Sequence, residues 1–99
     1  MNETDKPVAN PVVVLREEFD DWAVLFNPDS ANAAGTNPVG VAVWNRMNGR
    51  RSLAEIISEI KNSFEGASES ISKEIITFVN SLVENGFAGL ELERSNADA

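Results

Sequence analysis

The 99-residue sequence contains no cysteine, no histidine and no tyrosine. Without cysteine the chain can form neither a disulfide nor a thiol nucleophile nor a zinc thiolate site. Without histidine it lacks the most common general base and the most common metal ligand. Because only carboxylates, hydroxyls and lysines remain for chemistry, we expect no catalytic residue, no metal site and no cofactor.

Positive charge and long apolar runs are also scarce. The sequence has eight Lys and Arg residues and 16 Asp and Glu residues, so the net charge is −8. The longest apolar run, residues 22–26, is far shorter than the ~20 residues that span a bilayer. Residues 1–10 lack the apolar core of a signal peptide. We therefore expect a cytoplasmic protein without membrane contact, and the 42% hydrophobic content predicts one small globular domain.

The only cluster of basic residues in the sequence is Arg46, Arg50 and Arg51. It lies in the middle third of the chain, between two strongly acidic thirds. One interpretation is three solvated arginines near a helix end. The other is a small contact patch for an acidic partner.

The first third of the chain predicts three strands. Residues 11–16 are short and rich in β-branched side chains, residues 22–26 alternate, and the turn sequence 27–30 leads into residues 31–36. This third strand is weak, because it contains Ala, Asn and Gly instead of β-branched residues. Alternation puts two sets of second-strand side chains on opposite faces of the sheet: Trp22, Val24 and Phe26 against Ala23 and Leu25.

After Asn37 the hydrophobic period changes from 2 to 3.6, which predicts helices. Asn37 is a helix N-cap followed by proline, and Asn48-Gly49 is expected to end this first helix. Ser52 and Glu55 form a capping box that begins a second helix, which Gly66 would end.

A third helix, capped by Ser68 or Ser70, is expected to end at Asn85-Gly86. Its apolar side chains spread over about 160° of the helix surface, by the 3.6-residue repeat. A one-sided surface helix needs only ~100°. Either the helix lies deep in a small core, or one flank faces the core and the other lines a groove. The apolar positions are Ile71, Ile75, Ile76, Phe78, Val79, Leu82 and Val83.

The predicted order of three strands and then three helices gives an α+β domain, in which the helices cover one face of the sheet. We expect a loose arm over residues 1–10, the domain over residues 11–90, and a polar, acidic tail over residues 91–99. Within the domain, residues 87–90 would pack back on the helices.

Two functions follow from this layout. Three helices with tight connections are typical of helix-turn-helix DNA-binding proteins. However, the third helix carries Glu69, Glu74 and Glu84 against Lys73 alone, so it would repel phosphates. The other function is peptide binding, because a third strand at a sheet edge can pair with an extended peptide. A strand poor in β-formers can also be a protection against aggregation.

The order and spacing of several motifs resemble the PqqD family, over about residues 12–90. The family consists of RiPP recognition elements, small domains that bind the leader of a ribosomally made precursor peptide. The resemblance is greatest to stand-alone PqqD-like proteins encoded beside radical SAM enzymes, of the SynChlorMet cassette type. It rests on Asn37-Pro38-Val39-Gly40-Val41, Trp44, Asn48-Gly49, Ser52 through Ile56, Glu74-Ile75, Phe78-Val79, Leu82 and Gly86-Phe87.

The resemblance implies a three-stranded antiparallel N-terminal sheet followed by a three-helix winged-helix-like bundle. It implies a non-catalytic peptide chaperone that holds the leader beside the third strand and presents the precursor to a radical SAM maturase. We expect a monomer or weak dimer, since an exposed edge strand could also pair two copies. Ala34 and Thr36 depart from the family pattern, which has an aromatic and an aliphatic residue there. The implied peptide site is Asn32, Ala33, Ala34, Gly35, Thr36, Ile71, Glu74, Ile75 and Phe78.

Two alternatives to leader binding are a winged-helix DNA-binding regulator and an adaptor that docks on a modifying enzyme. The adaptor would use the partner-contact residues Arg46, Arg50 and Arg51 without binding a leader.

Overall fold

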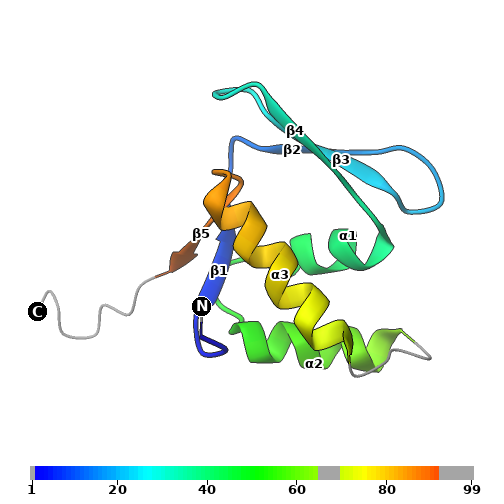
Figure 1. Cartoon of the computed structure of the whole chain (residues 1–99), viewed down its shortest axis with the longest axis vertical. Helices are drawn as coiled ribbons and strands as arrows, with labels where there is room; N and C mark the ends of the chain where they lie inside the picture. The colour runs from blue at the N-terminus through cyan, green and yellow to red at the C-terminus, as the bar shows by residue number, and fades with distance from the viewer. Residues whose placement is uncertain (1, 65–69, 92–99) are drawn as a thin grey trace, which may run out of the picture.

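The computed structural model describes residues 2–64 and 70–91. Within them the chain forms two small antiparallel sheets and three helices (Figure 1). The expected α+β class, with a three-stranded antiparallel sheet before three helices, is confirmed. A second, two-stranded sheet was not expected.

The three-stranded sheet has the order β2-β3-β4, with β2 at Val14–Glu17, β3 at Ala23–Asn27 and β4 at Asn32–Thr36. All three predicted strands are therefore present, the weak third one included. The first begins at Val14 rather than at residue 11, because the Val13 N–H bonds back to the Asn10 carbonyl in a turn.

The faces of this sheet divide as the alternation predicted. Ala23 and Leu25 are buried, and Leu25 belongs to the main hydrophobic core. Trp22 and Phe26 remain exposed on the opposite, outer face. In the register, Leu25 pairs with Leu15 on one side and with Ala34 on the other, so this row of side chains covers the helices.

Helix α1 spans Pro38–Trp44, and the Asn37 side chain accepts a hydrogen bond from the Gly40 N–H at 2.8 Å, as the cap predicted. The expected end at Asn48-Gly49 is wrong, because the helix stops four residues earlier. The residues that follow bond to another strand instead. The Met47 carbonyl accepts from the Ala9 N–H, and the Gly49 N–H donates to the Pro7 carbonyl.

Helix α2 spans Leu53–Ser63 and begins with the predicted capping box of Ser52 and Glu55. Helix α3 spans Ser70–Glu84. Gly86 follows it with a φ of 82°, the left-handed conformation expected of a glycine after a helix. Gly66 and Ser68, which were expected to end α2 and cap α3, lie outside the described residues.

Strands β1 (Lys6–Ala9) and β5 (Ala88–Glu91) pair antiparallel and form the second sheet (Figure 1). The expectation of a loose arm over residues 1–10 is therefore wrong for residues 6–9, and Glu91 belongs to a strand rather than to a tail. Pro7 is fully buried, and the β1 backbone bonds to the segment after α1, so this short stretch is fixed by tertiary contacts.

The core lies among the three helices, and Leu25 joins it from the inner face of the sheet. Its fully buried members each contribute about 1.5–3 kcal/mol through burial, and they include Leu25, Val43, Leu53, Ile56, Ile60, Ile75 and Val79. In the part of the chain that the structure describes, no helix has the length and apolar character needed to cross a membrane.

Candidate functional site

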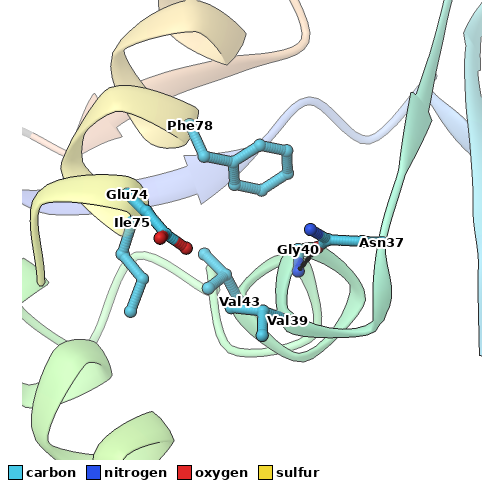
Figure 2. A pocket seen from close by; sticks show the side chains of 7 residues that line it. All are labelled: Asn37, Val39, Gly40, Val43, Glu74, Ile75 and Phe78. Carbon is cyan, nitrogen blue, oxygen red and sulfur yellow. Dashed lines mark hydrogen bonds between the residues drawn. The ribbon is translucent and has the colours of Figure 1, made fainter. Parts of the chain in front are cut away.

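A small pocket lies where the first turn of α1 faces the middle of α3 (Figure 2). Its volume is about 80 Å³. Helix α1 contributes one wall and α3 the other, and the residues that line it are Asn37, Val39, Gly40, Val43, Glu74, Ile75 and Phe78.

Gly40 explains how the two helices and β4 approach so closely. A Cβ atom at Gly40 would overlap the Thr36 hydroxyl and would stand 3.2 Å from Cζ of Phe78. The absence of a side chain therefore lets the last residue of β4, the first turn of α1 and the Phe78 ring meet at one point.

The two α3 side chains at the mouth of the pocket differ in character. Phe78 is half-buried and directs its ring toward Asn37 and Gly40, whereas Glu74 is exposed and its carboxylate points into the space between the helices (Figure 2). The pocket thus offers an apolar wall with one negative charge at its rim.

A second, more open hollow of about 490 Å³ adjoins this pocket along α3. It shares Asn37, Glu74 and Phe78 with the first and adds Ser70, Lys73 and Thr77. Together the two form a groove that follows α3 for two turns, and we call it the α3 groove.

Strand β4 ends beside the α3 groove and lies at the edge of its sheet. One side of β4 pairs with β3, and no other strand within residues 2–64 and 70–91 pairs with it. Thr36 is buried and Ala34 packs against the core, so these side chains face the helices. By alternation, Ala33 and Gly35 face outward. The free edge of β4 therefore offers backbone donors and acceptors next to a groove.

The nine peptide-site residues expected from the sequence fall into three groups. Glu74, Ile75 and Phe78 line the pocket, and Thr36 stands against it through Gly40. The residues Asn32, Ala33, Ala34 and Gly35 continue along the edge strand. Ile71 lines neither hollow and packs in the core.

The α1 side of the pocket was not expected from the sequence. Asn37, Val39, Gly40 and Val43 line it, although sequence reasoning assigned Asn37 only the role of a cap. A glycine in the first turn of a short helix was the available signal, since glycine costs helix stability and needs a packing reason.

Two of the three clustered arginines are held within the fold. Arg46 places its Nε 2.9 Å from Oε1 of Glu59, and Arg51 places its Nε 2.9 Å from Oε2 of the same carboxylate. Arg46 also donates a hydrogen bond to the Ala42 carbonyl. The hydrogen bond from Arg51, and then that from Arg46, holds the pKa of Glu59 below its ordinary value, although partial desolvation opposes the shift. Arg50 is exposed.

Comparison with known proteins gives a family and a fold. Residues 23–88 match the family model described as "Coenzyme PQQ synthesis protein D (PqqD)". A similar solved structure is that of "TbiB1 in Complex with the TbiA(beta) Leader Peptide", with a TM-score of 0.66 and 20% sequence identity. The similarity covers 87% of this chain and 96% of that one. No match was found among curated proteins.

Proposed function

Because this chain belongs to the PqqD family, we propose that it binds the leader of a ribosomally made precursor peptide and holds it for a modifying enzyme. The observation that carries the proposal is the position of the β4 edge, which ends at Thr36 directly beside the α3 groove. The similar fold of TbiB1, a structure that includes a leader peptide, supports it.

The leader would bind as an extra strand along β4. Its backbone would pair with the free N–H and C=O groups of β4, and every second side chain would turn toward α3. There the half-buried Phe78 ring offers apolar contact, the buried Ile75 backs the pocket, and the exposed Glu74 carboxylate favours a basic side chain. In this proposal the domain supplies no catalytic group, and its three helices form a winged-helix-like bundle.

We further propose that the modifying enzyme is a radical SAM maturase. A domain that holds both leader and maturase makes the encounter between enzyme and core peptide intramolecular, which raises their effective concentration. Arg50 is the clustered arginine that is exposed to a partner, while Arg46 and Arg51 are bound to Glu59. The variant Arg50→Glu should therefore weaken maturase binding and leave leader affinity unchanged. Unchanged maturase affinity would contradict this contact.

Leader binding can be tested by an NMR titration of the ¹⁵N-labelled protein with the synthetic leader of the precursor encoded beside it. We expect shifts concentrated in residues 32–43 and in the α3 residues of the groove. Phe78→Ala should weaken binding by roughly tenfold or more, as expected for a central aromatic contact.

Val83→Ala is the matched control, because Val83 is half-buried on the same helix and lies outside the groove. It should leave the affinity unchanged. Shifts scattered away from β4 and α3, or no binding at micromolar concentrations, would refute leader binding at this site.

A further inference from the structure

The outer face of the β2-β3-β4 sheet keeps large apolar side chains in contact with solvent. Phe19 is 72% exposed, Trp22 49% and Phe26 42%, and Val14 is exposed beside them. Among the described residues, the exposed large hydrophobic side chains all lie between Val12 and Phe26. Such a patch of apolar surface on a small domain is typical of an interaction site.

Gly35 of β4 leaves this outer face open toward the free edge. It pairs with Val24 in the register, and a Cβ atom placed on it would meet nothing within 4 Å. A hollow of about 520 Å³ lies over it, lined mainly by apolar side chains: Phe19, Trp22, Ala23 and Val24, with Glu18 at the rim. The hollow therefore extends from the β2–β3 hairpin to the edge strand.

A glycine on an edge strand is covered best by an aromatic side chain from the strand beside it. A strand added to β4 would lie about 4.8 Å from Gly35. Because Gly35 has no side chain, a ring projecting from the residue opposite it can cross β4 and contact Val24 and Trp22.

The charge of the β2–β3 hairpin indicates which type of leader residue would lie next to that aromatic ring. Glu18 lines the hollow and pairs with Arg16 at 3.1 Å, and Asp20 and Asp21 are exposed in the same hairpin. Charge complementarity with this acidic hairpin favours Lys or Arg in the bound segment and disfavours Asp or Glu.

We propose that the bound strand is also recognised on the outer face, through an aromatic side chain that lies over Gly35 against Trp22 and Phe19, with a basic residue next to it. This inference rests on the proposed leader binding and adds a second determinant to it. The α3 groove would bind the leader side chains that face the helices. The hollow over Gly35 would bind a leader side chain on the opposite face of the sheet.

Gly35→Val tests the hollow, because a valine side chain would occupy the space directly over residue 35 and suits a strand. The φ of Gly35 lies outside the left-handed region, and open space surrounds it, so the variant should fold. Gly89→Val is the matched control, since Gly89 also lies in a strand and also has nothing within 4 Å. The ligands are the synthetic leader of the adjacent precursor and versions with each aromatic residue changed to alanine.

Binding constants from calorimetry would form a double-mutant cycle. We expect Gly35→Val to weaken leader binding by roughly three- to tenfold, and Gly89→Val to leave the affinity unchanged. Replacing the relevant aromatic residue of the leader by alanine should weaken its binding to the natural protein by a similar factor. The same replacement should cause no further loss of affinity for the Gly35→Val variant. A leader that binds through β4 and the α3 groove with equal affinity to both glycine variants would overturn the inference and leave the proposed function intact.

Trp22 gives an independent signal. The sequence contains two tryptophans, and Trp44→Phe leaves Trp22 as the single indole. Its emission should shift to the blue as the leader covers it. An unchanged Trp22 signal at saturating leader would overturn the inference, whereas the absence of any leader binding would refute the proposed function. A blue shift that depends on protein concentration without peptide would assign the face to a second copy of the chain, and would also overturn it.

Discussion

Gly40 of α1 and Phe78 of α3 approach so closely that a single added methyl group at Gly40 would press on the Phe78 ring at 3.2 Å. The same methyl group would overlap the Thr36 hydroxyl at the end of β4. A glycine inside a helix costs about 1 kcal/mol relative to alanine. Here it allows an edge strand, a capped helix and an aromatic side chain to share one corner of the proposed binding site.

We expect Gly40→Ala to destabilise the protein by about 1–3 kcal/mol despite the better helix propensity of alanine, because the buried Thr36 side chain must move. Urea unfolding followed by circular dichroism would measure the change. Gly89→Ala, at a site with open space, should leave the free energy of unfolding nearly unchanged. If Gly40→Ala proved equal to Gly89→Ala, the close packing of α1 on β4 would be contradicted.

Asn27 joins the sheet to the turn after α3. Its buried side chain donates from Nδ2 to the Gly86 carbonyl at 3.2 Å and accepts from the Asp29 N–H at 2.9 Å. Asn27→Ala should cost about 1–2 kcal/mol of folding free energy, since it removes both hydrogen bonds of a buried side chain. Asn62→Ala, an exposed residue of α2, serves as the control and should change the urea midpoint little. Equal midpoints for the two variants would show that Asn27 contributes no net stability.

The capping box of α2 should also be visible in stability. The Ser52 hydroxyl accepts from the Glu55 N–H at 3.1 Å, and Glu55 accepts from the Ser52 N–H at 2.8 Å. Ser52→Ala removes the first bond, and we expect a loss of about 1 kcal/mol. Ser58→Ala changes an exposed position within the same helix, where alanine should be neutral or slightly stabilising. A neutral Ser52→Ala would argue against the cap.

Glu59 makes stability depend on pH. Its pKa is lowered by Arg51 and then by Arg46, so its folded pKa lies below the ordinary value of 4.5. The stabilisation is therefore complete above about pH 4.5 and is lost as the pH falls through the lower, folded value. We expect Glu59→Gln to be less stable than the natural protein at pH 7, with the difference shrinking in acid. Thermal unfolding of both proteins between pH 7 and pH 3 would measure it, and a constant difference would contradict the ion pairs.

Local signals in the sequence predicted those parts of the fold that local physics determines. The alternation of Trp22 to Phe26 predicted which face of the sheet is buried, and the caps at Asn37 and Ser52 predicted where helices begin. Strand β1 gave no such signal. It has four residues, one of them proline, and its partner β5 lies at the other end of the chain, so only tertiary contacts select it.

The site was predictable to a similar extent. Helical periodicity places Ile71, Ile75 and Phe78 on one side of α3, but it does not tell which neighbour covers each of them. Ile71 and Ile75 are both buried in the core, but Ile75 also lines the pocket with Phe78, opposite α1. The contribution of Val39, Gly40 and Val43 depends on how α1 approaches α3, and that approach is set by packing rather than by any local motif.

The pairing of β1 with β5 places Lys6 directly opposite Glu91, at one end of the second sheet. Two segments from opposite ends of the described chain therefore lie as neighbours, about 4.8 Å apart. Joining these two points with a short linker costs little loop-closure entropy. A circularly permuted form with new ends in the exposed β2–β3 hairpin should keep the β1–β5 sheet. For the same reason, inserting the domain into a surface loop of a host protein should require little separation of the two ends of that loop.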